Sequence, residues 1–209
     1  MRTPYKLADE AAARITMRLR QEFRHNRLAL FDEMRILDTR KHIKKLYKNA
    51  YDIIGNEFLR ILPALTKELQ EEALAAGYDG EVRKLDASWL KKFFSSYDPV
   101  TMYVFLREMD RKESRLFEAL VSNPKDWPQC YKTAENLLVR QARQYADNLE
   151  DEVTKIVYKD AGVKKVKWVA ELDAKTCTVC SEMDGTVYSL SDVPDKQHYN
   201  CRCYIVPVK

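Results

Sequence analysis

Two groups of residues near the C-terminus have the types and spacing of a metal site. Cys177 and Cys180 are separated by two residues, and His198, Cys201 and Cys203 form a second group that begins eighteen residues after Cys180. Thiolate sulfur and imidazole nitrogen are the ligands with which zinc forms closed, four-coordinate structural sites. The pattern therefore predicts one structural zinc ion, held by four of these five side chains.

Five candidates for four positions leave the ligand set open. Cys201 and Cys203 are two residues apart, so in a strand they would share a face, and both could bind the ion if His198 does not. Otherwise one of them packs as a small buried hydrophobe. The alternative to a metal site is a module that is simply rich in cysteine. Cys130 is isolated in the sequence and is expected only to pack against its neighbours.

Catalytic chemistry at this cluster is disfavoured. A catalytic zinc ion keeps an open coordination position and needs a base nearby. The carboxylates nearest in sequence are those of Asp173, Glu182 and Asp184. The sulfur-rich ligand set nevertheless indicates a closed site. A redox pair at Cys177 and Cys180 would need a thioredoxin-like strand and helix pattern around it, which is missing. We therefore predict that the chain is not an enzyme and has no catalytic residues.

Short strands and a turn are expected to bring the two ligand groups together. Residues 165–172 alternate loosely, with Val166, Trp168 and Ala170 on one face, which predicts a strand. Asp184-Gly185 predicts a turn that returns the chain towards the first ligand pair. Residues 186–188 and 204–208 are expected to form two further short strands.

The rest of the chain has the composition and periodicity of helices. Only five of its 209 residues are glycine and seven are proline, while Ala, Leu, Glu, Lys and Arg dominate. Apolar residues at three- and four-residue steps predict helices over 5–37, 39–76, 86–94, 98–122 and 130–160. Pro63 is expected to kink or split the second helix. Asp98-Pro99 is expected to begin the fourth, and Asn123-Pro124 to end it.

The predicted fold class is therefore mainly α, with an extended helical body and a small C-terminal α+β zinc-bound module. The expected division places the helical body at residues 1–128 and the C-terminal module at 129–209. That module would consist of a long helix over 130–160 and a zinc-binding β module over 163–209.

Positive charge is concentrated at the N-terminus. Residues 1–50 contain 13 Lys and Arg against 6 Asp and Glu, although the whole chain has a formal net charge of only +4. This asymmetry favours contact with nucleic acid or with an acidic protein surface, and a solvated helix face fits it equally well. The candidate phosphate contacts are Arg14, Arg18, Arg24, Arg27, Lys41, Lys44, Lys45 and Lys48.

No membrane span or secretory signal is expected. The sequence has no run of about 18 uncharged apolar residues, the minimum for a transmembrane helix. The first residues carry no apolar run of the kind that a secretory signal needs. Synthesis in a reducing cytoplasm is the expectation, and clustered cysteines in that compartment more often bind metal than form disulfides.

The C-terminal motifs resemble those of a known family. Residues 167–180 resemble the "W…D…TC..C" segment of phage head morphogenesis proteins, the Mu F-like minor head protein family. Residues 183–188 are similar to that family's following "LDG..F" turn, and residues 198–203 to its closing "HPNCRC". Tyr199 stands where proline is common, which leaves the ligands intact. The resemblance covers about residues 135–209, and the helices upstream are compatible with a variable N-terminal region.

This resemblance implies a virion component of a tailed bacteriophage with a structural role. Such proteins are made in the host cytoplasm and associate with the portal during head morphogenesis. The expected partners are the portal protein, the major capsid protein or both, at the head interior or portal vertex. Contact with packaged DNA is compatible with this role. The alternatives are a nucleic-acid-binding protein that uses the basic N-terminal helices and a zinc-dependent nuclease or hydrolase.

Overall fold

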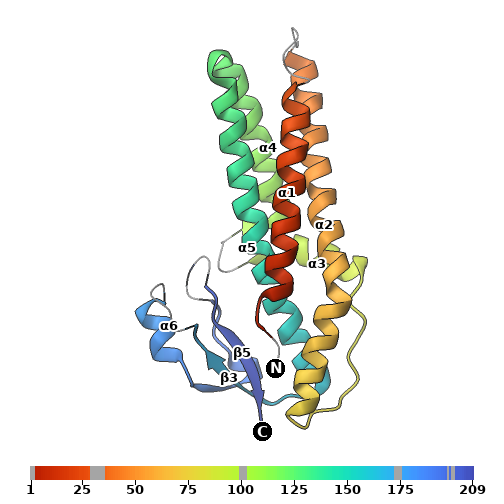
Figure 1. Cartoon of the computed structure of the whole chain (residues 1–209), viewed down its shortest axis with the longest axis vertical. Coiled ribbons are helices and arrows are strands. Elements are labelled where there is room, and N and C mark those ends of the chain that lie inside the picture. Colours follow the sequence, from red (N-terminus) through yellow and green to blue (C-terminus); the bar gives the residue numbers. More distant parts are fainter. Residues whose placement is uncertain (1–2, 29–35, 99–102, 172–175, 197, 199–200) are drawn as a thin grey trace.

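The chain forms an elongated helical bundle with a small sheet-containing module against one end (Figure 1). The computed structural model describes residues 3–28, 36–98, 103–171, 176–196, 198 and 201–209. Four long helices pack along one another: α1 (Lys6–Leu28), α2 (Ile36–Ala75), α4 (Phe105–Ser122) and α5 (Trp127–Ala161). The prediction of a mainly helical chain that ends in a small sheet-containing module is confirmed.

The first two helices are separate and antiparallel neighbours. α1 ends at Leu28 and α2 begins at Ile36, so the predicted single helix over 5–37 is wrong at its C-terminal end. The apolar pattern continues on both sides of the break, and periodicity alone therefore does not reveal it. Leu30 and Met34, which the same prediction included, lie outside the described residues.

Proline does not split the second helix. α2 runs without interruption through Pro63, whose side chain is exposed, so of the two predicted outcomes the split is wrong and the kink stays a prediction. A proline inside a helix costs about 3 kcal/mol. Its neighbours Ile61, Leu62 and Leu65 are buried, and each such burial contributes about 1.5–3 kcal/mol. The apolar face of α2 therefore outweighs the lost backbone hydrogen bond.

A short helix and a small hairpin connect α2 to α4. α3 (Ala87–Ser95) begins where it was predicted, because the Asp86 carboxylate accepts the backbone N–H groups of Ser88 and Trp89 at 2.9 and 3.1 Å. The predicted start of the next helix at Asp98-Pro99 is wrong. Instead β1 (Tyr97–Asp98) pairs antiparallel with β2 (Tyr103–Val104), and α4 begins at Phe105. Pro99 lies outside the described residues.

Packing of Phe105 explains why α4 begins so late. Its side chain is fully buried, with its ring centroid 4.6 Å from that of Phe94 and 4.5 Å from that of Tyr145. This tertiary contact fixes the first turn of the helix against α3 and α5. A capping motif in the local sequence is a weaker determinant than a fully buried aromatic side chain.

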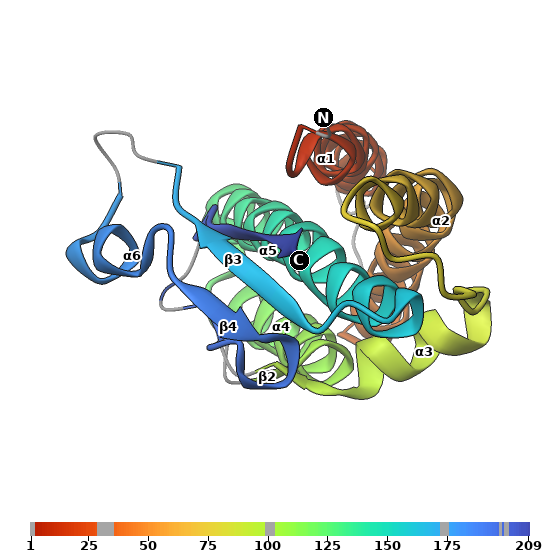
Figure 2. The same cartoon turned by 90° about the horizontal axis from the view of Figure 1, so that it is seen from below.

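The long helix α5 is the central element of the molecule. α4 ends at Ser122, a single turn η1 (Pro124–Asp126) follows, and α5 ends at Ala161, where it is capped by Gly162 with a left-handed φ of 87°. The end of α4 agrees with the prediction from Asn123-Pro124, and α5 begins three residues before the predicted residue 130 and ends one residue after the predicted residue 160. Apart from Arg143, every residue from Gln141 to Glu150 is buried. The sheet lies against α5, and α1, α2 and α4 pack against the rest of that helix (Figure 2).

The sheet has β3 (Lys165–Val169) at its centre, with β4 (Val187–Ser189) and β5 (Tyr204–Val208) antiparallel on either side. A turn η2 (Leu190–Asp192) follows β4. Val166, Trp168 and Ala170 are buried, as the alternating pattern predicts, and the intervening Lys165 and Lys167 are exposed. The three predicted strands therefore form, although β3 ends at Val169, short of the predicted range of 165–172, and β4 begins one residue later than expected.

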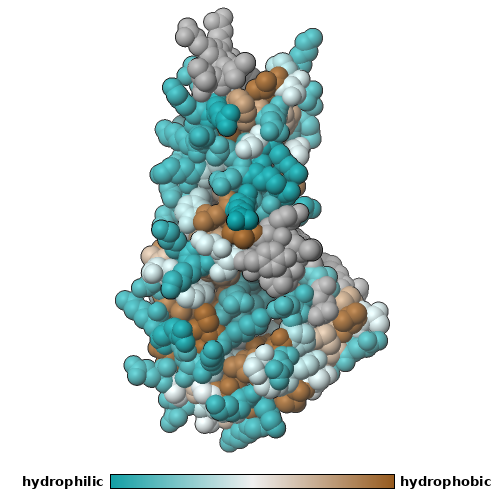
Figure 3. Space-filling view, turned by 180° about the vertical axis from the view of Figure 1, so that it is seen from behind, coloured by the Kyte–Doolittle hydropathy of each residue, from teal (hydrophilic) through white to brown (hydrophobic). Residues whose placement is uncertain are grey.

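The face of the molecule seen in Figure 3 is mostly polar, with apolar side chains at several places on it. Large exposed apolar residues such as Met17, Leu74 and Leu137 occur on different helices. Scattered exposure of this kind is ordinary for a folded protein. Among the described helices, none combines the length and the apolar content that a bilayer span needs.

Candidate metal centre

Cys177 and Cys180 lie at the start of a short helix. α6 (Thr178–Met183) begins after Cys177, whose Sγ accepts the backbone N–H of Cys180 at 3.4 Å. The Cys177 carbonyl also accepts the backbone N–H of Ser181 at 3.0 Å. This helix was not predicted from the sequence, because six residues are too few for a periodic signal. The helical turn brings both sulfur atoms to one side of the loop.

The Asp184-Gly185 turn fixes α6 to the end of β3. An Asp184 carboxylate oxygen accepts the backbone N–H of Ala170 at 2.8 Å, and the Gly185 N–H donates to the Trp168 carbonyl at 2.9 Å. Gly185 has a φ of 76°, a left-handed conformation that favours glycine. The predicted turn therefore forms, and it sets the position of the first ligand pair relative to the sheet.

The second ligand group begins in a tight turn and ends at β5. The backbone N–H of Cys201 donates to the His198 carbonyl at 3.3 Å, which closes a three-residue step like that between Cys177 and Cys180. Cys203 directly precedes β5. The intervening Tyr199 and Asn200, which belong to the predicted motif, lie outside the described residues.

The structure brings all five predicted ligands together. Cys180 Sγ lies 3.5 Å from His198 Nε2 and 3.6 Å from Cys201 Sγ. Two triplets have ligand atoms within 4.8 Å of one another, and Cys180 belongs to both. They are Cys177, Cys180 and His198, and Cys180, Cys201 and Cys203. Cys180, Cys201 and Cys203 are buried, whereas Cys177 and His198 are partly exposed.

These distances fit the edges of a tetrahedral zinc site. Zinc–sulfur bonds of about 2.3 Å and zinc–nitrogen bonds of about 2.0–2.1 Å place two sulfurs about 3.8 Å apart and a sulfur and nitrogen about 3.6 Å apart. The two measured contacts of Cys180 agree with these values. The donor set, with its soft sulfur atoms, also matches the preference of zinc. The cluster can therefore hold a metal ion.

The environment of the thiols differs across the cluster. The backbone N–H of Cys180 is the main cause that lowers the pKa of Cys177, and the Cys180 side chain and His198 add to it. Burial raises the pKa of the Cys180 thiol, and burial is also the main cause that raises the pKa of Cys203. A bound cation would offset this desolvation, because metal-bound cysteine is a thiolate.

The carboxylates near the cluster are poorly placed to act as a catalytic base. Asp184 accepts a backbone N–H within the turn that it forms, and Glu182 is exposed on α6. Asp173 lies outside the described residues. Cys130 packs between α4 and α5, with its Sγ 3.9 Å from the Ala119 carbonyl oxygen, as expected for an isolated cysteine.

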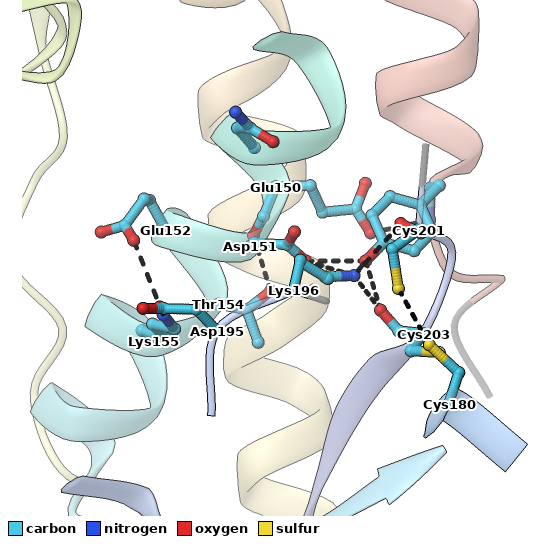
Figure 4. A network of polar contacts seen from close by, with 12 residues as sticks. Glu150, Asp151, Glu152, Thr154, Lys155, Cys180, Asp195, Lys196, Cys201 and Cys203 are labelled. Carbon is cyan, nitrogen blue, oxygen red and sulfur yellow. Dashed lines mark hydrogen bonds and ion pairs between the residues drawn. The ribbon is translucent and has the colours of Figure 1, made fainter. Parts of the chain in front are cut away.

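A polar network attaches the second ligand group to the bundle (Figure 4). The Lys196 ammonium donates to the carbonyls of Cys203 and Cys201 and to the Tyr5 hydroxyl, and it lies 3.3 Å from Asp151 of α5. Only 11% of the Lys196 side chain is exposed. Sequence reasoning missed this network, and no sequence signal marks it, because Tyr5 and Lys196 are 191 positions apart.

Three tyrosine hydroxyls also hold carbonyl oxygens at and beside β5. The hydroxyl of Tyr5 lies 2.7 Å from the Cys203 carbonyl, that of Tyr158 lies 3.5 Å from the Ile205 carbonyl, and that of Tyr78 lies 2.8 Å from the Val208 carbonyl. Tyr5 precedes α1, Tyr158 lies in α5, and Tyr78 follows α2. The bundle therefore fixes β5, and Cys203 directly before it, at three points along their length.

The predicted phosphate contacts fall into two groups. Arg14 and Arg18 bind the buried Glu57 carboxylate at 2.7 and 3.1 Å, so their charge is already paired within the bundle. These two arginines are in turn the main reason that the pKa of Glu57 is lowered, against the effect of burial. The remaining candidates with described side chains are exposed on α1 and α2: Arg24, Lys41, Lys44, Lys45 and Lys48. The Arg27 side chain lies outside the described residues.

The comparisons with known proteins agree with the C-terminal motifs. An uncharacterized protein of Haemophilus influenzae (strain Rd) is 27% identical over 166 residues, which cover 77% of this chain and 34% of that protein. The chain therefore spans about a third of the length of that curated relative. No solved structure matches the chain. Residues 114–206 match the family described as "Phage Mu protein F like protein". This span contains all of α5 and all five candidate ligands, and the match therefore supports, for this region, the similarity to the phage Mu F-like family that the motifs indicate.

Proposed function

We propose that this chain is a structural component of phage head morphogenesis, with a zinc-stabilised C-terminal module. The Mu F-like match over α5, the sheet and the ligand cluster is the observation that carries this proposal. Residues 129–209 would be the unit that acts in head assembly. Residues 1–128 would form the helical support on which that unit rests.

The zinc ion in this proposal is held by Cys177, Cys180, His198 and Cys201. Two three-residue steps, one from Cys177 to Cys180 and one from His198 to Cys201, each supply two ligands from a hydrogen-bonded turn. Cys180 Sγ already lies at the distances expected between two ligands of a tetrahedral zinc ion from both His198 Nε2 and Cys201 Sγ. Cys203 would then be the spare thiol, packed at the start of β5.

Single alanine variants test this ligand set. Cys201→Ala should abolish stoichiometric zinc binding, whereas Cys203→Ala should retain one zinc ion per chain. Substitution of cobalt for zinc gives a visible spectrum that reports the number of thiolate ligands. Three thiolates in both the parent protein and Cys203→Ala support the assignment. Loss of one thiolate in Cys203→Ala would show that Cys203 is a ligand and that the spare residue is another.

The proposed role of the zinc ion is structural. Four protein ligands close the tetrahedral site and leave no position for water or substrate. The ion would join α6 to the segment that precedes β5. These two parts of the chain lead into β4 and β5, which lie on opposite sides of β3 in the sheet. A small module of this kind takes much of its folding free energy from the metal.

The proposed partners are the portal protein, the major capsid protein or both, and the proposed location is the head interior or portal vertex of the virion. Co-expression with the cognate portal protein, followed by affinity capture of the portal, tests this. The parent protein and Cys130→Ala should be captured, since Cys130 lies outside the cluster. Cys180→Ala should be captured poorly. No capture of the parent protein, together with its absence from purified virions, would overturn the proposal.

Contact with packaged DNA is a second candidate role. The exposed cations in the first turns of α2, Lys41, Lys44, Lys45 and Lys48, favour it, because they follow one another at helical steps. Each neutralised phosphate releases counterions, so binding should weaken steeply with salt. Replacement of the four lysines by glutamine should remove DNA binding at low salt. Replacement of Arg14 and Arg18 should affect the fold more than binding, since both pair with Glu57. Binding that is independent of salt would contradict this role.

A further inference from the structure

The segment that carries the second ligand group also holds the first turn of α1. Lys196 lies two residues before His198, and its ammonium is placed over the Tyr5 ring, 4.8 Å from the centroid. It donates to the Tyr5 hydroxyl and to the Cys203 carbonyl together. Figure 4 shows Lys196 pointing between Asp151 and the Cys203 backbone. One side chain thus joins the metal-binding loop, the start of α1 and α5.

Tyr5 is held in a conformation that needs this support. It is the one residue other than glycine with a positive φ, 58°, among the described residues. Such a backbone conformation is unfavourable for a bulky side chain and persists only where surrounding contacts impose it. Its backbone N–H donates to Glu150 at 2.7 Å, and its hydroxyl lies 2.7 Å from both Asp151 Oδ1 and the Cys203 carbonyl oxygen. The side chain is 2% exposed.

A second contact ties the ligand group to α1. Arg202, between Cys201 and Cys203, binds Asp9 of α1 at 3.0 Å and Glu171 at 3.1 Å. Asp9 also lies 3.6 Å from Arg143 of α5. The segment that carries the metal ligands therefore contacts both Tyr5, directly before α1, and Asp9 in the first turn of that helix.

The first half of α1 depends on such contacts more than the second half. Its buried face from residue 8 to residue 12 consists of Ala8, Ala11 and Ala12, whereas the later turns bury Ile15, Leu19 and Phe23. Alanine removes little apolar area from water compared with leucine or phenylalanine. The polar contacts of Tyr5 and Asp9 therefore supply a large share of what fixes the start of α1.

We propose that Tyr5 and Lys196 are positioning residues of the metal centre, and that metal binding and the docking of the first turns of α1 are coupled. This inference rests on the proposed zinc site. With α1 docked, the Tyr5 hydroxyl holds the Cys203 carbonyl and positions Lys196, which holds the carbonyls of Cys201 and Cys203, and these contacts order the segment that presents the ligands. By linkage, the ion must stabilise the docked α1 by the same factor by which docking raises metal affinity. Metal loading thus controls whether the apolar face under the start of α1 is covered.

Two matched tyrosine variants test the coupling through metal affinity. Tyr5→Phe removes the hydroxyl at the Cys203 end of β5, and Tyr78→Phe removes the hydroxyl at its Val208 end. Zinc affinity is measured by competition with a chelator, and the cobalt spectrum reports the ligand geometry. Tyr5→Phe should weaken affinity roughly tenfold, the lower end of the effect of partners that orient metal ligands. Tyr78→Phe should leave affinity within about twofold. Lys196→Met should weaken it like Tyr5→Phe, and Lys196→Arg should restore part of the loss.

Hydrogen exchange tests the same coupling from the other side. In the full-length protein, removal of zinc should increase exchange at residues 6–15 of α1 and leave residues 105–122 of α4 unchanged. Tyr5→Phe should reproduce part of this increase with zinc present. If zinc binds but does not change hydrogen exchange in α1, or if Tyr5→Phe and Tyr78→Phe have equal zinc affinity, the coupling is overturned while the proposed zinc site stands. A parent protein that binds no zinc or cobalt would overturn the proposed site and the coupling with it.

Discussion

The bundle and its junction with the C-terminal module are held together by different kinds of contact. In the bundle, aromatic rings from three helices pack closely. The centroid of Phe94 lies 5.8 Å from that of Phe58 and 4.6 Å from that of Phe105. At the junction, apolar residues of the sheet such as Trp168 and Ile205 also join the core. Hydrogen bonds and ion pairs, such as those of Tyr5, Lys196 and Arg202, add to this packing. The two regions share α5, which is buried by both.

This difference affects how each region should respond to change. Apolar packing is not directional, so the loss of folding free energy grows with the number of methylene groups removed, and neighbouring side chains partly relax into the space. Metal ligands and buried polar partners act only in a narrow geometry, and each missing partner leaves another group unsatisfied. The bundle should therefore lose stability gradually and the junction abruptly.

The largest expected effect is that of removing the ligand shared by both triplets. Cys180→Ala should abolish zinc binding and unfold β3, β4 and β5, because zinc binding contributes on the order of 10 kcal/mol to small modules. The bundle helices α2 and α4 should keep their protection in hydrogen exchange. Cys130→Ala is the matched control and should keep both the metal and the sheet. An intact sheet in metal-free Cys180→Ala would show that the junction does not depend on the ion.

The comparison also explains which parts of the fold could be predicted from the sequence. Helices with a long apolar stripe, such as α5, and the alternating strand β3 are determined by local periodicity, and both were predicted. The start of α4 was not, because a tertiary contact of Phe105 sets it. The five candidate ligands were found because their residue types are rare and their spacing is close.

The partners of the ligands could not be predicted in the same way. Tyr5, Lys196 and Arg202 are ordinary residue types, and their roles arise only when the N-terminus meets β5 in space. Likewise, nothing in the sequence distinguishes Arg14 and Arg18 from the other basic residues of α1, although both form ion pairs with Glu57. Contacts between distant parts of the chain leave no local pattern. The division at residue 128 and the DNA contacts of the remaining lysines stay predictions.

The next largest effect should come from the bundle core. Phe105→Ala removes a fully buried ring between α3 and α5 and should destabilise the chain by about 3–5 kcal/mol. Urea unfolding with zinc present measures this. Phe117, partly buried on the same helix, provides the control, and Phe117→Ala should cost about 1 kcal/mol. Zinc affinity of folded Phe105→Ala should match that of the parent protein. A large loss of affinity would show that bundle and junction are one cooperative unit.

A smaller effect is expected where the chain passes the end of α5. A Cβ atom added to Gly80 would lie 2.5 Å from the Asp160 carbonyl oxygen, so backbone would have to move. Gly80→Ala should cost roughly 1–3 kcal/mol. Gly55→Ala is the matched control, because its Cβ would meet only Phe94 at 3.8 Å. Gly55 lies inside α2, where alanine favours the helix by up to about 1 kcal/mol. Equal urea unfolding midpoints for Gly80→Ala and Gly55→Ala would contradict the close approach of Gly80 to the backbone at the end of α5.

The smallest effect concerns a buried acid at the junction. Burial, with contributions from Asp151 and Asp9, raises the pKa of Asp147 to about 7. The folded chain therefore holds this proton at pH values where the unfolded chain, with an aspartate pKa of about 3.9, has released it. Stability should fall as pH rises through this range, by about 1 kcal/mol between pH 6 and pH 8.

Asp147→Asn isolates this effect from the rest of the junction. Asparagine stays neutral at every pH, so the variant should lose the pH dependence due to residue 147 while keeping a similar shape. Urea unfolding at pH 6, 7 and 8 with saturating zinc gives the slope for both proteins. A flatter slope in Asp147→Asn would place the pH sensitivity of the folded chain at the junction. If the two slopes are equal, Asp147 is ionised in the folded protein, and the cations Lys196 and Arg202 outweigh its burial.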